Sequence, residues 1–552
     1  MKLSIFAAVF FALLNVSAVA KDDDYYLKTN KSFDIYGAIF RELNKNYVLE
    51  IDPEALMANG IDGMLSNLDP YTVFMDPSES EDIDIIASGS YVGLGISVGN
   101  RDSMLTVTGV YDGYPARESG IRIGDRIYKI DNNVILFEKS DNIRKYTKGA
   151  PGTRVDLWLI RDGRADTLKY TITRREIEIK NISYYGLAAS DIGYIKLDRF
   201  SRFSANEVKL ALNELKNKYS IQGLIIDIRN NPGGLLDAAI GISELFLPEG
   251  SEIVTTRGRN GSDEIIYKSR SSVHDTTLPI AVLINENSAS ASEVLAGAIQ
   301  DHDRGLILGR RSFGKGLVQS IIELPHKSNL KMTTARYYTP SGRCIQRLEY
   351  TGKNGDKQVR EIISDSVFYT KNGRKVYESK GIMPDSVIEP ADFYSDFTVK
   401  LARTTHIFNF ANRVAAQYDT LPETFAVDKR LLAKFKEYLT LKKFIWEPPI
   451  IETANRLKAI ADSTGATREA VRLIGRLEKA LAKDKKDPFE LNFDELKKLL
   501  EFEIKSRFMA EPDLVKYSIA NDINIRTSVN LLKTDKYKNL LTTGSNAGSR
   551  MN

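Results

Sequence analysis

Three serines separated by alanines, Ser288, Ser290 and Ser292, lie between an apolar run and a segment with helical spacing. This order predicts that they stand where a buried strand ends and a helix begins. Backbone N–H groups at a helix N-terminus carry partial positive charge that stabilises an oxyanion, so a serine there suits acyl transfer. With Glu293, the same residues match the S-x-x-E capping box. The local pattern therefore leaves open both a cap and a nucleophile, and which serine would act.

Lys315 is a second candidate, because it stands between Gly314 and Gly316 at the entry to an apolar, strand-like run. A lysine that acts as a general base must be uncharged, which requires a site that lowers its pKa by desolvation. Gln319 follows at an even spacing on the same strand face and can hydrogen-bond an amine without adding negative charge. A solvated loop lysine is the alternative.

The segment from Asp227 to Gly234 follows a predicted parallel strand. Ligands in α/β sheets bind at the carboxyl ends of the strands, and glycines let a backbone N–H approach a reacting carbonyl. A plain strand-to-helix turn is the alternative for this segment.

Two other motif matches do not have the structural context that their chemistry requires. Ser97 satisfies G-x-S-x-G but lies inside an alternating strand pattern, so we interpret it as structural. The segment from Ser328 to Lys331 satisfies S-x-x-K but lies in a polar connection between two strands, which predicts a hairpin turn.

Five parts follow one another along the chain. Residues 1–20 have the charged start, apolar run and small-residue end of a cleaved secretory signal, with an uncleaved anchor as the alternative. Residues 21–80 have helical spacing, and residues 81–173 show short alternating strands broken by glycine. Residues 174–390 alternate strands with helices, as in βαβ units, and residues 391–552 are helical in pattern with a polar tail.

The strands and helices that would position the candidate residues can be given residue ranges. Two continuous apolar runs, 223–228 and 279–284, predict buried strands of a largely parallel sheet. Helical patterns occupy residues 205–218, 235–247 and 293–301.

Composition limits the chemistry and the partners. The net charge of +4 is small for 552 residues, so neither nucleic acid nor a membrane surface is indicated as the main partner. Cys344 is the only cysteine, which excludes an intrachain disulfide. The four histidines are scattered and no HExxH or Cys-rich pattern occurs, so we expect no metal or other cofactor. We expect an exported protein, periplasmic or extracellular, without stable membrane insertion after signal removal.

Five segments together resemble the C-terminal processing, or tail-specific, peptidases. They are, in that family's order and spacing, Asp227–Gly234 (DIRNNPGG), Ser288–Gly297 (SASASEVLAG), Ser312–Gln319 (SFGKGLVQ), Thr333–Gln346 (TTARYYTPSGRCIQ) and Gly381–Asp385 (GIMPD). The resemblance implies a multidomain α/β protein with a crotonase-like (ClpP/crotonase-type) protease core. This core would carry an inserted, mostly-β PDZ domain, a helical N-terminal unit and a helical C-terminal region. The resemblance covers residues from about 35 to 390.

The resemblance also implies roles for single residues. The family's nucleophile, the central serine of SASASE, falls on Ser290, and its base, the lysine of FGKG, falls on Lys315. Gln319 would support that lysine. The oxyanion hole would consist of the backbone N–H groups of Ala291 and Gly233.

The β unit resembles the PDZ domain that these peptidases carry. Gly93, Leu94, Gly95 and Ile96 resemble its carboxylate-binding loop, and the segment 115–125 resembles the PAxxAGLxxGD signature. Such a loop captures a C-terminal carboxylate while the peptide adds as a strand.

The resemblance therefore implies an extracytoplasmic serine endopeptidase with a Ser/Lys dyad and an acyl-enzyme. Its partners would be unfolded or tail-marked polypeptides with free, apolar C-termini, and homo-oligomerisation is left open. Ser312, Leu94 and Ser119 differ from the family's commonest residues and affect only the expected side-chain preference of the PDZ groove. The alternatives are a non-catalytic PDZ scaffold and a lipophilic-ligand-binding relative of the same fold.

Overall fold

The computed structural model describes residues 3–77, 79–80, 85, 89–138, 143–261, 263–270, 274–353, 356–378, 380–389, 394–483 and 486–542. They form two compact units. The smaller unit comprises the chain up to Asp76 together with residues 320–333 and 350–360. The larger unit comprises residues 77–319, 334–349 and 361 onward.

Helices dominate the N-terminal part of the smaller unit, as the sequence predicts. They are α1 (Leu3–Asn46) and α2 (Pro53–Leu65), followed by the short strand β1 (Val73–Met75). Asp52 caps α2 by accepting hydrogen bonds from the N–H groups of Glu54 and Ala55. Cleavage after residue 20 stays a prediction. Among the residues that the structure describes, no helix combines the length and apolar composition needed to cross a membrane.

A hairpin formed by β17 (Leu317–Glu323) and β18 (Asn329–Tyr338) reaches into the smaller unit. There β1 pairs antiparallel with residues 329–331 of β18. Ser328 lies in the turn, and its hydroxyl donates to the carbonyl of Pro325 at 2.7 Å. The hairpin predicted for the S-x-x-K match is confirmed.

The predicted PDZ domain occupies residues 90–178 of the larger unit. Its elements are β2 (Ser90–Gly93), β3 (Ile96–Arg101), β4 (Met104–Val110), α4 (Pro115–Glu118), β5 (Arg126–Ile130), β6 (Asn133–Val134), α5 (Arg144–Thr147), β7 (Arg154–Ile160), β8 (Leu168–Thr173) and β9 (Arg175–Glu178). The main sheet has the strand order β3-β4-β5-β7-β8, so β3 is an edge strand. Strands β2 and β9 pair antiparallel where the chain enters and leaves the domain.

The α/β core is built on a sheet of order β10-β11-β12-β15-β16-β23 within the described residues. These strands are β10 (Ile182–Ala189), β11 (Ile192–Leu197), β12 (Gly223–Asp227), β15 (Ile280–Ile284), β16 (Leu306–Gly309) and β23 (Ser386–Val387). Only β10 and β11 pair antiparallel, and the other neighbours are parallel. The crossover helices are α6 (Ser204–Tyr219), α7 (Leu236–Glu244) and α8 (Ala291–Asp301). The two predicted strands and three predicted helices are therefore confirmed, with small shifts at their ends.

Further strands lie outside this sheet, and two of them, β19 and β20, fall largely in the smaller unit. The further strands are β13 (Glu252–Arg257), β14 (Ile265–Lys268), β19 (Leu348–Lys353), β20 (Asp356–Glu361), β21 (Val367–Tyr369) and β22 (Lys375–Tyr377). Within the larger unit, β13 pairs with β14 and with residues 336–338 of β18.

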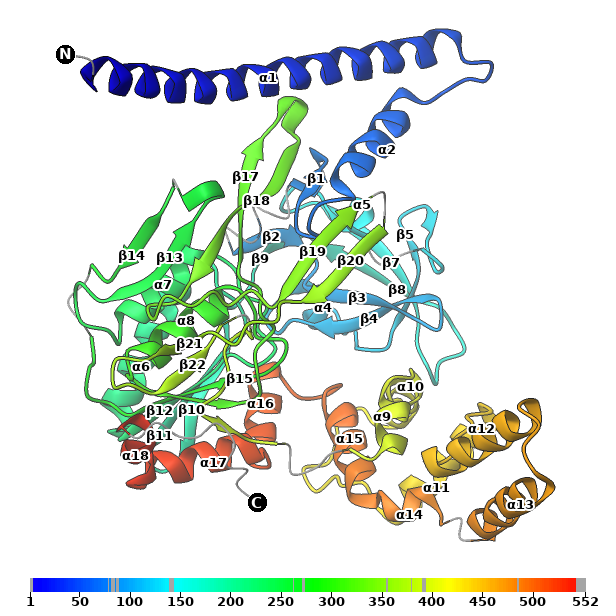
Figure 1. The fold of residues 1–552 in the computed structure, drawn as a ribbon. Coiled ribbons are helices and arrows are strands. Elements are labelled where there is room, and N and C mark those ends of the chain that lie inside the picture. The colour runs from blue at the N-terminus through cyan, green and yellow to red at the C-terminus, as the bar shows by residue number, and fades with distance from the viewer. Residues whose placement is uncertain are drawn as a thin grey trace. The chain divides into compact units, whose positions relative to one another are not determined.

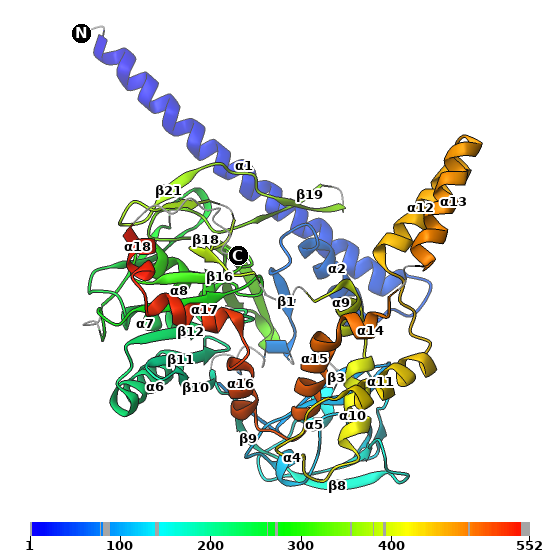
Figure 2. The ribbon, with the colours of Figure 1, turned by 90° about the horizontal axis from the view of Figure 1, so that it is seen from below.

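Alternate side chains of the buried strands point to opposite faces of the core sheet. In β12, Leu224 and Ile226 pack with α6, α7 and α8, whereas Ile225 packs with the last helices of the chain. Those helices are α16 (Glu511–Ile519), α17 (Ile523–Leu532) and α18 (Lys536–Thr542). Figures 1 and 2 show them on the sheet face opposite α6 to α8. The core thus has three layers, and the third comes from the region that the sequence set apart as residues 391–552.

Residues 396–483 and 486–508 form a helical domain, whose apolar core comes from α9, α10, α11, α14, α15 and the segments next to them. Its helices are α9 (Asp396–Ala402), α10 (His406–Ala415), α11 (Lys429–Leu441), α12 (Pro449–Ser463), α13 (Arg468–Lys483), α14 (Pro488–Leu491) and α15 (Phe493–Lys505).

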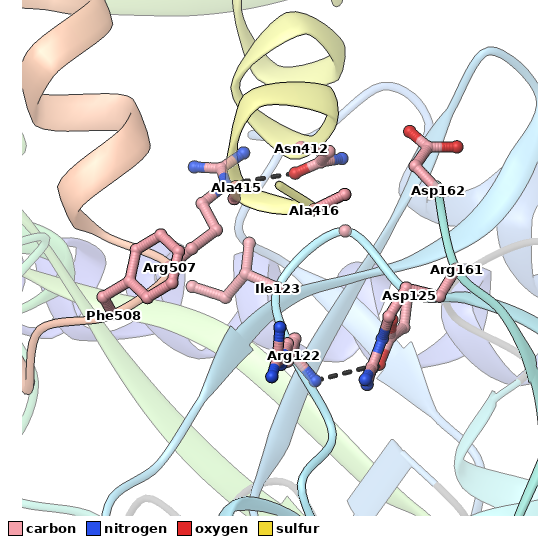
Figure 3. A pocket seen from close by; sticks show the side chains of 11 residues that line it. Arg122, Ile123, Asp125, Arg161, Asp162, Asn412, Ala415, Ala416, Arg507 and Phe508 are labelled. Atoms are coloured by element: carbon pink, nitrogen blue, oxygen red, sulfur yellow. Dashed lines mark hydrogen bonds and ion pairs between the residues drawn. The ribbon is translucent and has the colours of Figure 1, made fainter. Parts of the chain in front are cut away.

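The helical domain contacts the PDZ domain through Asp102 and Gly124, among other residues. Asp102, in the turn after β3, accepts a hydrogen bond from Nδ2 of Asn409 at 2.7 Å. Gly124 packs so closely on α10 that a Cβ there would lie 2.4 Å from the side chain of Asn412. The Oδ1 of Asn412 in turn accepts from Nε of Arg507 at 3.0 Å, beside a cavity of about 30 Å³ (Figure 3).

Candidate active site

Ser290 lies at the strand-to-helix junction predicted for it, directly before α8. Its φ of 55° and ψ of −115° are outside the regions that a non-glycine residue favours. A strained turn of this kind between strand and helix presents a serine at the rim of a sheet, as in a nucleophile elbow. The residue is 9% exposed.

The carboxylate of Glu293, in the first turn of α8, is fully buried and accepts four hydrogen bonds. Its Oε2 accepts from the backbone N–H groups of Ser290 (2.9 Å) and Lys315 (2.8 Å). Its Oε1 accepts from the N–H of Gly314 (2.7 Å) and the hydroxyl of Ser312 (2.5 Å). The backbone nitrogens of Ser290 and Lys315 therefore lie within the combined length of two hydrogen bonds. Burial raises the pKa of Glu293 above its ordinary value, although these hydrogen bonds oppose the rise.

The glycines beside Lys315 are required by close packing against a neighbouring segment. A Cβ at Gly314 would lie 2.5 Å from the Cβ of Arg347, and one at Gly316 would lie 2.6 Å from the backbone nitrogen of Gln346. The side-chain oxygen of Gln346 accepts from the N–H of Gly316 at 2.7 Å. Lys315 itself is half-buried.

Two further side chains lie near these residues in sequence or in space. Gln319 lies on β17, half-buried, and its Nε2 donates to the carbonyl of Leu317 at 3.1 Å. Burial raises the pKa of Tyr337 to about 12, and the nearby side chain of Ser290 opposes this rise. The phenol of Tyr337 is therefore neutral at physiological pH.

The DIRNNPGG segment packs directly against the start of α8. The carbonyl of Asn231 accepts from the N–H of Ala289 (3.1 Å) and the hydroxyl of Ser292 (2.9 Å). Gly233 has a φ of +99°, and a Cβ there would lie 2.6 Å from the oxygen of Ala289 and 3.0 Å from the nitrogen of Ala291. The backbones of Gly233 and Ala291 are thus adjacent, while the N–H of Gly233 donates to Oδ1 of Asn231 at 2.9 Å.

Glu293 and Asn231 belong to this site although the sequence did not single them out as site residues. The sequence indicated Glu293 only as the acidic residue of a capping box, and its hydrogen bond from the N–H of Ser290 is indeed a helix cap. Its other partners come from residues 312–315, which no local pattern connects to α8. For Asn231, the available signal was its place between a strand end and two glycines.

The loop predicted to bind a peptide carboxylate connects β2 to β3. Gly93 ends β2, and Ile96 begins the edge strand β3. The side chain of Leu94 is buried in the core of the PDZ domain. Gly95 has a φ of +80°, and a Cβ there would lie 2.6 Å from the Cβ of Tyr114, so this position needs glycine.

Ser97 lies on β3, and its hydroxyl hydrogen-bonds with that of Tyr111 at 2.9 Å, so its placement in a strand is confirmed. Within the described ranges, no group of three or more His, Cys, Asp or Glu side chains could hold a metal ion.

Family models match four parts of the chain. The model for peptidase family S41 matches residues 191–354, and a PDZ domain model matches residues 92–172. The "Activating protease CtpB N-terminal domain" matches residues 12–79. The model named "Probable PDZ-protease, C-terminal helical domain" matches residues 397–532.

Curated relatives agree with these matches. The carboxy-terminal-processing protease of Bartonella bacilliformis is 38% identical over 326 residues, which are 58% of this chain and 74% of the relative. The carboxy-terminal processing protease CtpB of Bacillus subtilis is 30% identical over 335 residues, which are 60% of this chain and 68% of the relative. A solved photosystem II D1 C-terminal processing protease is 30% identical, with a TM-score of 0.36, over 55% of this chain and 83% of its own. From the family models and curated relatives, the chain belongs to peptidase family S41, among the PDZ-containing serine proteases of the carboxy-terminal processing type.

Proposed function

We propose that this serine peptidase is an endopeptidase with Ser290 as its nucleophile and Lys315 as its general base. The proposal rests on one observation: Oε2 of Glu293 accepts from the backbone N–H groups of both residues. A nucleophile and its base must lie within hydrogen-bond reach of each other. One buried carboxylate that joins the two backbones supports that arrangement.

The reaction follows from these roles. Oγ of Ser290 attacks the peptide carbonyl while its proton passes to the uncharged amine of Lys315, which then donates it to the leaving nitrogen. The bond between carbon and leaving nitrogen breaks, and an ester to Ser290 remains. Water then attacks this acyl-enzyme, Lys315 takes the water proton and returns it to Oγ, and the new carboxyl terminus leaves. Gln319 orients the amine of Lys315.

Charge that develops on the carbonyl oxygen needs N–H donors aimed at it. The N–H of Ala291, at the start of α8, is one, since the helix N-terminus adds partial positive charge. The N–H of Gly233 is the second donor. During the reaction its hydrogen bond to Oδ1 of Asn231 is replaced by one to the oxyanion.

Substrates are selected by their C-termini, through the PDZ domain. The edge position of β3 supports this, because an extended peptide can add to an unpaired strand edge while the loop at Gly93 to Ile96 holds the terminal carboxylate. Tethering raises the local concentration of the chain near Ser290. The secretory layout of residues 1–20 supports action outside the cytoplasm, on unfolded or tail-marked proteins with apolar C-termini.

The test is hydrolysis of one unfolded substrate that carries either a free apolar C-terminus or its amide. Replacement of Ser290 or Lys315 by alanine is expected to lower kcat by about 10³-fold or more, by analogy with other serine hydrolases. The matched control is Ser328→Ala, in the hairpin turn, which should keep wild-type activity. Amidation is expected to lower kcat/KM about tenfold, the size of one lost charged contact.

Each arm has an outcome that counts against the proposal. Wild-type activity in Ser290→Ala would remove the nucleophile assignment. Equal hydrolysis of the free and amidated substrates would remove C-terminal selection. Binding of the free-ended peptide with no turnover would favour the PDZ scaffold.

A further inference from the structure

Asp522 immediately precedes α17, and its two carboxylate oxygens have different partners. Oδ1 accepts from the N–H groups of Asn524 (2.8 Å) and Ile525 (3.3 Å), which caps the helix. Oδ2 forms an ion pair with Nη2 of Arg229 at 2.8 Å. Because one oxygen suffices for the cap, the other connects the third layer of the core to the DIRNNPGG segment.

Arg229 belongs to a network of largely buried charges. Its Nε and Nη2 bind the carboxylate of Asp227 at 3.0 and 2.5 Å. Nζ of Lys196 reaches Asp227 at 3.4 Å and donates to the carbonyl of Arg229 at 2.6 Å. The side chains of Lys196, Arg229 and Asp227 are 16%, 18% and 1% exposed. Nζ of Lys196 also lies 3.9 Å from Oδ1 of Asp198. Without the charge of Asp522, the guanidinium of Arg229 keeps one carboxylate partner, Asp227, which it shares with Lys196.

The residue next to Arg229, Asn230, is hydrogen-bonded to the loop that carries Ser290. The N–H of Asn230 donates to Oδ1 of Asn285 at 2.9 Å, and Nδ2 of Asn285 donates back to Oδ1 of Asn230 at 2.8 Å. This pair joins the segment to the loop that carries Ser290. The next residue, Asn231, holds the backbone of that loop as described above. A displaced Arg229 would therefore move the residues that face Ser290.

Packing alone does not hold the guanidinium of Arg229 in place. A cavity of about 560 Å³ borders the network, between the strand ends of the core and residues of α15, α16 and α17. Its lining includes Lys196, Asp227, Arg229, Phe502, Val515 and Ile525. Since the cavity leaves room for another side-chain conformation, the two carboxylates determine where the guanidinium lies.

We propose that Asp522 is a positioning residue for the reaction at Ser290 and acts through Arg229. The catalytic part of this inference rests on the proposed function. It makes the C-terminal helices part of the scaffold that sets the active-site loop, since Asp522 supplies the second carboxylate partner of Arg229.

The test compares Asp522→Asn with Asp191→Asn in the full chain. Asparagine caps a helix as well as aspartate does, so Asp522→Asn removes the charge and keeps the cap. The control residue Asp191 forms an ion pair with Lys533, at the other end of α17. Asp191→Asn therefore removes an ion pair between the same helix and the core, but far from residues 228–235. Both variants are compared by peptide hydrolysis and by hydrogen exchange in the peptide that covers residues 228–235.

In Asp522→Asn, kcat is expected to fall about tenfold with KM within about twofold, and exchange in residues 228–235 to rise about tenfold. Asp191→Asn should change neither, and Asp522→Glu should restore most of the activity. Unchanged exchange in Asp522→Asn, or an equal rise in Asp191→Asn, would overturn the inference. If no Ser290-dependent hydrolysis occurs in the wild type, the proposed function fails, but the exchange comparison still decides whether Asp522 positions the loop.

Discussion

Ser290 and Lys315 donate their backbone N–H groups to the same carboxylate oxygen, at 2.9 and 2.8 Å. That oxygen belongs to Glu293, which is buried in the first turn of α8. One side chain of α8 therefore fixes how far apart the backbone nitrogens of the proposed nucleophile and base lie.

Replacement of Glu293 by glutamine should destabilise the protein and abolish hydrolysis. An amide offers one acceptor oxygen and places an NH₂ group against donors that the second carboxylate oxygen now accepts. Buried donors without an acceptor cost about 1–3 kcal/mol each, so the free energy of unfolding should fall by about 2–4 kcal/mol in urea denaturation. The control is Glu286→Gln, an exposed partner of Arg310, with an expected loss below about 1 kcal/mol. Equal losses in the two variants would contradict the role of Glu293.

Replacement of Gly233 by alanine should lower kcat by about tenfold or more, because the new Cβ would meet the backbone oxygen of Ala289 at 2.6 Å. Gly250→Ala is the matched control. Gly250 has a comparable left-handed φ of +80° but no atoms within 4 Å of the added Cβ. The Gly250→Ala variant therefore has the conformational strain of alanine at positive φ without a steric clash. Kinetics on both variants at a temperature where both are folded checks the prediction. Similar kcat values would mean that close packing at Gly233 does not matter for the reaction.

The stability of the core should depend on acid pH through Asp227. Burial alone would raise the pKa of Asp227, but the charges of Arg229 and Lys196 hold it well below the ordinary value of 3.8. Because the folded pKa is depressed, the stabilisation is fully present above pH 3.8 and is lost as the pH falls below that value and through the folded pKa.

Urea unfolding of the wild type and Asp227→Asn between pH 7 and pH 2 measures this contribution. The gap between their free energies of unfolding should stay constant at neutral pH and narrow below about pH 4. A gap that does not change with pH would show that the carboxylate of Asp227 has no depressed pKa.

Gly124→Ala should loosen the contact between the PDZ domain and the helical domain. The added Cβ would lie 2.4 Å from the side chain of Asn412, which the hydrogen bond from Arg507 holds in place. Hydrogen exchange in α10 should rise about tenfold, since the helix loses a packed neighbour. Gly120→Ala, in the same loop with a φ of +85° and open space around it, should leave α10 unchanged. A rise in both variants would point to strain in the loop rather than to the contact with Asn412.

Local pattern sufficed to predict the elements that carry the candidate residues. The apolar runs that became β12 and β15 are buried on both faces, and their unbroken hydrophobicity is the signal of such strands. The helical spacing of apolar residues after residue 290 predicted α8, because this spacing too can be recognised within a short stretch of sequence. The roles of Ser290 and Lys315 came from the family resemblance and stay predictions.

Partners far apart in the chain could not be predicted in this way. Glu293 and Lys315 are brought together by the path of the chain between α8 and β17, and neither spacing nor composition encodes that contact. The same holds for α16 to α18, because the periodicity of an amphipathic helix shows which face is apolar but not whether a helix or a sheet covers it.

The return of residues 511–542 to the core sheet has a consequence for biosynthesis. While these helices are still in the ribosome, the sheet face with Ile225, Leu283 and Leu308 lacks their cover, and Arg229 has no second carboxylate. The protease core therefore gains its third layer only after residues 511–542 have left the ribosome, long after its strands have been synthesised.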